Sequence, residues 1–312
     1  MSTGAVAVTA LGIRALGVFH HHIGRSLVSI VVLSILSAAS YGLAAVLQHQ
    51  EVIREPQEMS MRAGLLVRLA RRPVWLIGNA LDGVGYLFQF LALRRGALAL
   101  VEPILVLSLV FALPVAAWRD HRRIAGSEFM STGIIMVGLA LFLGVARPGL
   151  GHPLASKEAW ASLSAVVLVG CSATALGARR GSRRRAAVLL GLGSGAAFGY
   201  VAALTERTGH LLNAGVVHLL ATWVPYALLV GGTGALLLTQ SAFHAGALRL
   251  SLPTLTVAQP LVAVAIGLWL FGEHLDSRGV APVLEVLGLS LVTLGVFALG
   301  RAPVIGTDPG TA

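Results

Sequence analysis

Residues 27–47, LVSIVVLSILSAASYGLAAVL, form a run without a single charged side chain. An α-helix rises about 1.5 Å per residue, so about 20 apolar residues cross the hydrocarbon core of a bilayer, which is about 30 Å thick. A helix also satisfies its own backbone polar groups, as a segment surrounded by lipid must. The stretch therefore predicts a membrane-spanning helix, and similar runs along the chain define the rest of the fold.

Eight further runs of this kind give nine predicted spans in total. They are residues 27–47, 74–93, 97–118, 128–145, 159–177, 186–205, 223–243, 250–271 and 279–300. The connections 48–73 and 206–222 are too polar or too short to be assigned as spans by the same rule. Whether residues 4–19 or 48–73 add a further membrane segment stays open. We therefore expect an all-α polytopic membrane protein with about nine transmembrane helices.

The composition excludes the ordinary soluble classes. The chain of 312 residues is 56% hydrophobic and 12% charged, whereas soluble proteins average about 25% charged residues. The net charge of +10 is carried between the uncharged runs, so we expect a bilayer and not a nucleic acid as the partner. Cys171 is the only cysteine, which excludes a disulfide scaffold.

Lysine and arginine are distributed unequally between the two sides of the predicted membrane. The N-terminal segment and the even-numbered loops carry eight of them, and the odd-numbered loops with the C-terminus carry fifteen. We expect a multi-pass protein of the cell membrane, and the positive-inside rule then places its N-terminus outside and its C-terminus in the cytoplasm. We expect the arginine run at 179–185 to contact anionic lipid, and residues 60–72 to form a basic helix lying on the membrane surface.

Two sequence words occur once in each half of the chain and in the same order. GALALVEP at 96–103 matches GALRLSLP at 246–253, and YGLAAV at 41–46 matches FGYVAA at 198–203. Each half then holds four spans with the fifth between them, and an odd linking span gives the halves opposite orientation. Inverted-topology repeats are common in secondary transporters, which bind their substrate at the repeat interface near the membrane midplane. The alternative is that short words rich in Ala, Leu and Gly recur by chance.

The repeat defines the expected domain organisation. It consists of an N-terminal segment (1–26), a first repeat (27–147), a linking span with its arginine-rich loop (148–185), a second repeat (186–300) and a disordered tail (301–312).

One helical face of the second span is polar. Asn79, Asp82, Tyr86 and Gln89 follow one another at steps of three or four residues, which places them on the same side of a helix. Ionisable residues at membrane depth are costly and are by default hypotheses for a functional site. Asp82 is therefore a candidate for binding a cation or carrying a coupling proton; alternatively, the polar face packs on another helix and is inert.

The third span carries an acid beside a break in the helix. Glu102 precedes Pro103, which removes a backbone hydrogen bond and frees a carbonyl group. Such a site could hold a cation, which makes Asp82 and Glu102 the two candidates for a metal ligand. The alternative for Glu102 is an acid near the membrane interface, where a charge is tolerated.

The second half supplies neutral polar groups. Thr254, Thr256 and Gln259 stand between two prolines of the eighth span and form a plausible half of a substrate site. On the seventh span, Gln240 joins these candidates, and we expect His244, one turn further on, to be a solvated anchor at the interface.

Glycines at 191, 195 and 199 have the spacing of a close helix–helix contact, either within the fold or between the subunits of a homodimer. The sequence offers no Ser/His/Asp grouping, no metal-spaced His/Cys cluster and no phosphate loop. We therefore expect neither an enzyme nor a cofactor.

The stretch 246–275, with its proline-interrupted helix and terminal GEHL, resembles the second half of drug/metabolite-superfamily transporters of the EamA type. The nine-span count is closest to their NIPA-like branch, whose members are associated with magnesium transport. The Gln89-Phe90 pair and the LVEP element ending at Pro103 keep the spacing of that branch's Asn-Phe and Leu-Val-x-Pro elements. Tyr86 stands where the branch carries an acid, and Asp82 lies one turn earlier.

The leading hypothesis is thus a secondary transporter that moves a small solute or cation by alternating access of the two repeats. The resemblance adds a magnesium or other divalent-cation transporter as an alternative. A third reading is a non-transporting membrane scaffold or lipid-handling protein.

Overall fold

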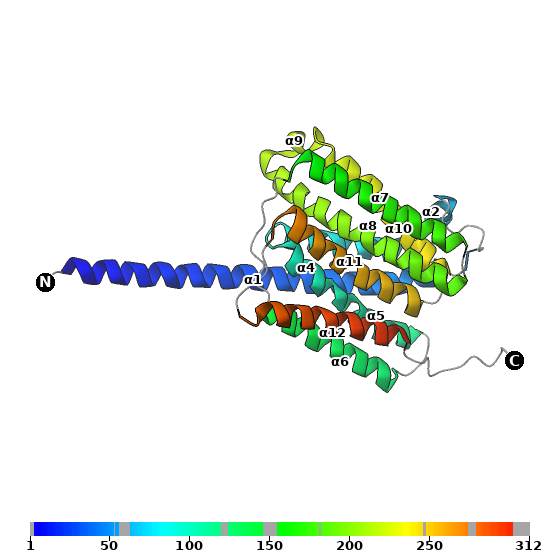
Figure 1. Ribbon diagram of the computed structural model, residues 1–312, viewed down its shortest axis with the longest axis horizontal. Coiled ribbons are helices and arrows are strands. Elements are labelled where there is room, and N and C mark those ends of the chain that lie inside the picture. Colours follow the sequence, from blue (N-terminus) through cyan, green and yellow to red (C-terminus); the bar gives the residue numbers. More distant parts are fainter. Residues whose placement is uncertain are drawn as a thin grey trace.

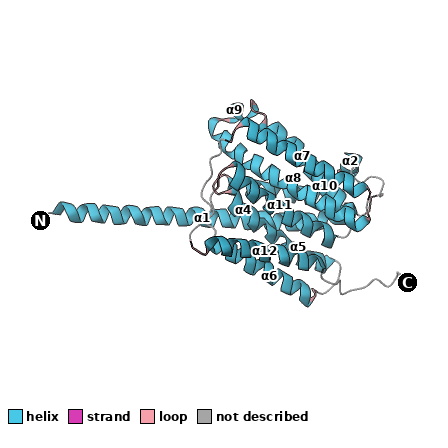
Figure 2. Cartoon of the chain, viewed as in Figure 1, coloured by secondary structure: helices cyan, strands magenta, loops and turns pink. Residues whose placement is uncertain are grey.

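A computed structural model describes residues 3–52, 54–55, 63–119, 124–145, 155–180, 182–245, 248–273 and 279–301. Regular secondary structure in these ranges is entirely helical (Figure 2). The helices are α1 (Thr3–Val52), α2 (Ala63–Leu69), α3 (Pro73–Leu93), α4 (Leu98–Ile104), the 3₁₀ turn η2 (Leu105–Leu107), α5 (Ser108–Arg119), α6 (Gly126–Val145), α7 (Lys157–Arg179), α8 (Arg183–Leu211), the 3₁₀ turn η3 (Leu212–Ala214), α9 (Val216–Leu220), α10 (Val224–Ala245), α11 (Leu248–Leu270) and α12 (Ala281–Arg301).

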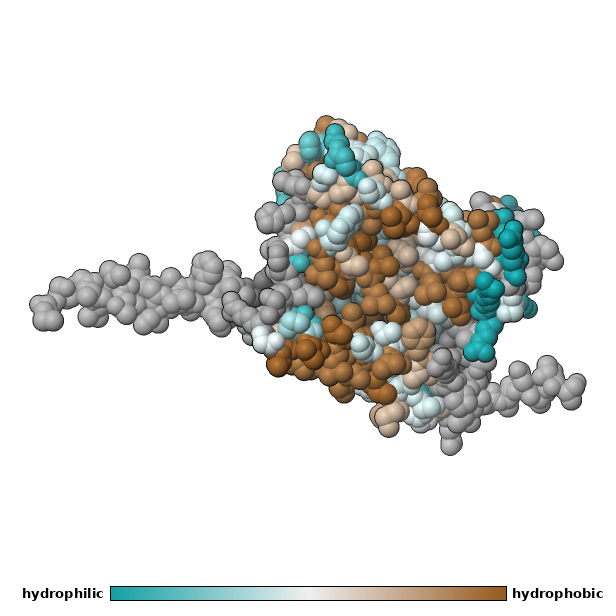
Figure 3. Space-filling model, viewed as in Figure 1, coloured by the Kyte–Doolittle hydropathy of each residue, from teal (hydrophilic) through white to brown (hydrophobic). Residues whose placement is uncertain are grey.

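Nine helical segments of the described chain are long and apolar enough to cross a membrane. They are Leu27–Val52, Pro73–Leu93, Leu98–Arg119, Gly126–Val145, Lys157–Arg179, Arg183–Ala214, Val224–Ala245, Ser251–Leu270 and Ala281–Leu299. Each coincides with one predicted span, so the prediction of an all-α chain with nine such helices is confirmed. Hydrophobic residues cover the middle of the bundle, and hydrophilic residues gather toward its two ends (Figure 3).

The helices form one bundle, in which Leu98–Arg119, Arg183–Ala214 and Ser251–Leu270 are the most buried spans. Helix α1 packs against α3 and α5, α8 packs against α10 and α11, α6 pairs with α12, and α7 covers α8 (Figure 1). The first half of α1 extends beyond the bundle, so the predicted N-terminal segment 1–26 is helical from Thr3 and continuous with the first span. The first candidate span begins and the last one ends at opposite ends of the bundle, as an odd number of spans requires.

The glycines of α8 bring its backbone against α11. A Cβ atom on Gly195 would lie 2.5 Å from the carbonyl oxygen of Leu255, and one on Gly199 would lie 2.9 Å from that of Gln259. Only glycine leaves room for two helices this close. The predicted close packing is confirmed, and it serves the interior of the fold.

One expectation about the polar connections was wrong, and another stays a prediction. His244 is 1% exposed instead of solvated, and its Nε2 lies 2.7 Å from the backbone oxygen of Glu55. The basic segment does form a helix, α2, which buries Leu65 and Leu69 and leaves Val67 and Arg68 exposed. Arg68 also forms an ion pair with Glu55 at 2.7 Å, so Glu55 contacts both elements just after the end of α1.

Several predicted features fall outside the described residues. They are residues 56–62 of the basic segment, 246–247 of the second repeat word, 274–275 of the stretch that carries the family resemblance, and the tail 302–312.

Candidate functional site

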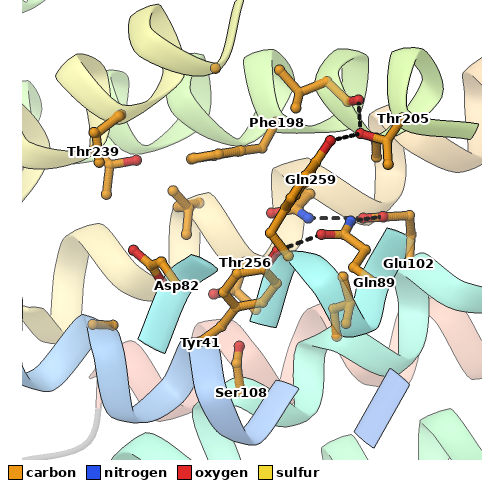
Figure 4. Close-up of a pocket in the computed structure, with 18 of the residues that line it drawn as sticks. Tyr41, Asp82, Gln89, Glu102, Ser108, Phe198, Thr205, Thr239, Thr256 and Gln259 are labelled. Atoms are coloured by element: carbon orange, nitrogen blue, oxygen red, sulfur yellow. Dashed lines mark hydrogen bonds between the residues drawn. The ribbon is translucent and has the colours of Figure 1, made fainter. Parts of the chain in front are cut away.

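A cavity of about 440 Å³ lies inside the bundle and is lined by both halves of the chain. The first half contributes side chains from α1, α3, α4, η2 and α5, and the second half contributes them from α8, α10 and α11. Figure 4 shows polar groups from these helices pointing toward one another across the cavity. Side chains from both halves of the chain therefore meet at this cavity.

Seven of the nine predicted site residues line this cavity: Asn79, Asp82, Tyr86, Gln89, Glu102, Thr256 and Gln259. The polar face predicted on the second span thus points inward as one unit. Gln240 and Thr254 lie outside the lining. Gln240 is fully buried behind it, and Thr254 donates to the backbone oxygen of Ser251 at 2.9 Å where α11 meets Gly191.

Glu102 is held by one glutamine from each half of the chain. Gln89 Nε2 donates to its Oε1 at 2.6 Å, and Gln259 Nε2 donates to its Oε2 at 2.9 Å. Tyr41 extends the network by donating to Gln89 Oε1 at 2.6 Å (Figure 4). Because Glu102 is fully buried, these donors replace the water that a carboxylate would otherwise need.

Glu102 lies beside an irregular part of the third span. Helix α4 ends at Ile104, one residue after Pro103, and the 3₁₀ turn η2 joins it to α5. Pro103 lacks a backbone N–H group, so the carbonyl group of Ala99, one turn earlier, loses its usual helical donor. Glu102 lines the cavity at this point.

The start of α4 is anchored by an acid from the other half. Glu273 accepts hydrogen bonds from the backbone N–H groups of Leu98 and Ala99, at 2.9 and 3.0 Å. Unpaired N–H groups and the helix dipole favour a carboxylate at this end. Burial raises the pKa of Glu273 above its usual value, while the two backbone hydrogen bonds act in the opposite direction. Glu273 and Glu55 therefore lie at opposite ends of the bundle, after α11 and after α1.

Asp82 belongs to a second polar chain that also joins the halves. Gln48 Nε2 donates to Asp82 Oδ2, and Gln240 Nε2 donates to Gln48 Oε1, both at 2.5 Å. Gln240 Oε1 in turn accepts from the indole N–H of Trp75 at 3.4 Å. Gln240 therefore acts on the cavity through Gln48 and orients the amide that faces Asp82.

Two tyrosines connect the polar groups of the cavity. Figure 4 places Tyr41 between Asp82 and Glu102, and both acids are near enough to act on its hydroxyl group electrostatically. Tyr86 reaches across to α8, where its hydroxyl lies 3.0 Å from Thr205 Oγ1. The cavity wall is thus tied together by hydroxyl groups as well as amides.

The polar lining residues that were not predicted include Tyr41, Gln48 and Thr205. Tyr41 lies within the repeated word at 41–46, and Gln48 is the first polar residue after the first predicted span, so both carried a usable signal. Glu206 was predicted to lie in the connection 206–222. In the structure Glu206 continues α8, is 5% exposed and lies near Glu102 and Glu273.

The charge of the cavity is one-sided. Asp82 and Glu102 are its acidic lining residues, and the described lining contains no lysine, arginine or histidine. The rest of the wall is mainly apolar or aromatic, with Phe198 and Phe243 among its members. In the part of the chain that the structure describes, no three His, Cys, Asp or Glu side chains form a group that could hold a metal ion. The arrangement fits a positively charged or hydrogen-bonding organic molecule.

The nine apolar helices and the inner cavity indicate a polytopic membrane protein. An uncharacterized protein from Corynebacterium glutamicum is similar to this chain, with 29% identity over 272 residues, which are 87% of this chain and 94% of that protein. No family model matches the sequence. No solved structure matches it either.

Proposed function

We propose that the protein is an integral-membrane secondary transporter of the drug/metabolite type, which moves a small solute by alternating access of two inverted repeats. The observation that carries this proposal is the cavity between the halves. There the carboxylate of Glu102 is bound by Gln89 of its own half and by Gln259 of the other. A polar cavity deep among apolar spans is where secondary transporters built from such repeats bind their substrates.

Matching hydrogen bonds support the repeat. Ser37 donates to the backbone oxygen of Gly85 at 2.8 Å, and Ser194 donates to that of Ala235 at 3.2 Å. The two serines are 157 positions apart, which is also the spacing of the repeated words at 41 and 198. The two acceptor residues are 150 positions apart, which is the spacing of the words at 96 and 246. The same contact therefore recurs between α1 and α3 and between α8 and α10, at the spacings of the sequence words.

Glycine contacts support the repeat independently. A Cβ on Gly42 of α1 would collide with the backbone of α5, as one on Gly199 of α8 would with α11. Between α6 and α12, a Cβ on Gly138 would lie 2.7 Å from the oxygen of Gly288, and one on Gly288 would lie 2.8 Å from the oxygen of Gly138. Reciprocal contacts of this kind are expected where a two-fold axis passes. These two glycines are again 150 positions apart.

Alternating access would exchange contacts between the halves at the two ends of the cavity. At one end Glu55 of the first half meets His244 of the second, and at the other Glu273 of the second half caps α4 of the first. Rocking of one repeat against the other would open one of these contacts while the other stays closed. The hydrogen bond from Gln259 to Glu102 joins the halves within the cavity, where a bound substrate would compete with it.

The observations favour an organic solute over the other two candidates. Both oxygens of Glu102 already accept amide hydrogen bonds, and a magnesium ion needs six oxygen ligands in near-ideal geometry. Magnesium or another divalent cation remains the second candidate because Asp82 and Glu102 line one cavity. A scaffold that transports nothing has no need of such a cavity.

We also propose the orientation that the charges indicate. The described arginines of α2, of the end of α7 and of the start of α8 lie at the end of the bundle where α12 finishes. This end would face the cytoplasm and its anionic lipid, with the N-terminus outside. A homodimer is compatible with these observations and is not required by them.

Solid-supported-membrane electrophysiology on proteoliposomes tests the function, with a panel of amines, amino acids and nucleosides. We expect a transport current for at least one compound, and its loss in Asp82→Asn. Glu285→Gln is the matched control, because it also changes a buried acid to its amide but on α12, outside the cavity lining. A panel without any current, or an unchanged current in Asp82→Asn, would contradict the proposal.

A further inference from the structure

We propose that the cavity binds an amphiphilic organic cation whose apolar chain reaches the bilayer through a lateral opening between α3 and α10. The inference rests on the proposed function, because it names the substrate class of the transport site.

Three cavity-lining residues are exposed on the outside. They are Gly83 on α3 and Leu229 and Thr233 on α10, and Leu229 is 68% exposed. The cavity wall is therefore thinnest between α3 and α10, and the proposed opening lies there.

A hydrogen bond joins the two helices near one end of the bundle. Trp75, near the start of α3, donates to Gln240, near the end of α10, at 3.4 Å. Further along, Gly83 of α3 and Gly232 of α10 both line the cavity. A Cβ on either glycine would have no other atom within 4 Å, which is the mark of open space.

The opening lies at mid-membrane. Gly83 is in the middle of α3 (Pro73–Leu93) and Gly232 is near the middle of α10 (Val224–Ala245), and both helices are long enough to span a bilayer. The opening therefore faces acyl chains and not headgroups or water. By the spacing of the repeat, Gly83 corresponds to Thr233, so the opening lies on the pseudo-two-fold axis and would stay at mid-membrane in either state of the transporter.

The chemistry of the wall selects the ligand. Asp82 and Glu102 supply negative charge that no basic lining residue balances, and Tyr41, Tyr86 and Phe198 supply aromatic faces for a cation. The apolar chain of the ligand can extend past Leu229 into the hydrocarbon core of the bilayer, where apolar groups are stable. A small hydrophilic solute would gain nothing from a side opening toward lipid.

Binding of two probes to the protein in nanodiscs of zwitterionic lipid tests the inference. The probes are dodecyltrimethylammonium and butyltrimethylammonium, measured by equilibrium dialysis with empty nanodiscs as background. We expect Asp82→Asn to weaken both probes by about tenfold, because each loses the charge that faces its ammonium group. We expect dodecanoate, which has the same chain length as the longer probe and the opposite charge, not to bind.

Filling the opening should separate the two probes. Gly232→Leu places a side chain in the mouth and should weaken the dodecyl probe by about tenfold, while the butyl probe, which fits inside, changes by less than about twofold. Thr233→Phe serves the same purpose if the glycine variant folds poorly. Gly133→Leu is the control, since Gly133 is exposed on α6 with nothing within 4 Å of its Cβ position.

The outcomes distinguish failure of this inference from failure of the proposed function. Three results would overturn the inference. They are no binding of either cation, binding of dodecanoate as tight as that of dodecyltrimethylammonium, and equal effects of Gly232→Leu and Thr233→Phe on the two cationic probes. Transport of a hydrophilic solute without cation binding would remove the inference and keep the proposed function. Cation binding that shows this chain-length dependence, without any transport, would keep the inference and remove the proposed function.

Discussion

Gly138 and Gly288 let the backbones of α6 and α12 touch, so a methyl group added at either position should push the two helices apart. A Cβ at Gly138 would lie 2.7 Å from both the oxygen of Gly288 and the nitrogen of Val292, whereas ordinary contacts begin at 3.4 Å. The helices would have to separate by the difference, about 0.7 Å, since the atoms met are backbone atoms. Overpacking of this kind costs about 1–3 kcal/mol.

The helix propensity of alanine partly masks that cost, so a control is needed. Replacing glycine by alanine inside a helix gains about 1 kcal/mol by itself. Gly133→Ala lies on the same helix α6 with nothing within 4 Å of the added atom and shows the gain alone. The difference between Gly138→Ala and Gly133→Ala should therefore equal the overpacking cost of about 1–3 kcal/mol.

The free energy of unfolding can be measured by titrating the protein with sodium dodecyl sulfate in mixed micelles. Gly288→Ala should match Gly138→Ala, because its Cβ would lie 2.8 Å from both the oxygen of Gly138 and the nitrogen of Phe142. A Gly138→Ala protein as stable as Gly133→Ala would refute the close crossing. Clearly unequal effects at the two glycines would refute the two-fold relation between the repeats.

Three further predictions concern the polar contacts between the halves. Glu102→Gln keeps one acceptor oxygen for two amide donors, so it should lose about 1.5–3 kcal/mol of stability and the transport current, whereas Glu285→Gln keeps the current. Gln240→Leu leaves the amide of Gln48 and the indole of Trp75 without their partner, which should destabilise the protein by about 1–3 kcal/mol and shift its tryptophan fluorescence. An unchanged fluorescence spectrum would contradict the contact between Gln240 and Trp75. In Glu273→Gln the side chain keeps one acceptor oxygen for the two backbone N–H groups, which should lower the free energy of unfolding by about 1.5–3 kcal/mol and speed hydrogen exchange at Leu98 or Ala99. Equal exchange in the variant and the parent protein would contradict the cap.

The spans could be predicted because their signal is local. A membrane helix is defined by the length and hydropathy of one continuous stretch, and the shared face of Asn79, Asp82, Tyr86 and Gln89 follows from the helical repeat alone. The close packing at Gly195 and Gly199 is likewise encoded in a four-residue spacing.

The partners across the bundle could not be predicted, because they depend on how the helices are placed. Nothing near Gln240 in the sequence indicates that it reaches Gln48, which lies in the other half. His244 was misjudged for the same reason, since its contact with the backbone of Glu55 depends on the tertiary fold. Its polarity and its place near the end of a span indicated the membrane–water interface, and the tertiary fold buried it instead.

Access to the cavity from each side of the membrane tests the central proposal most directly. In a Cys171→Ala background, Thr256→Cys would place the only thiol in the cavity wall, where Thr256 is 6% exposed. A membrane-impermeant thiol reagent is applied to one face or the other, in intact cells and in inverted vesicles. Alternating access predicts modification from both faces, with substrate slowing each reaction. Modification from one face only, however long the exposure, would contradict it.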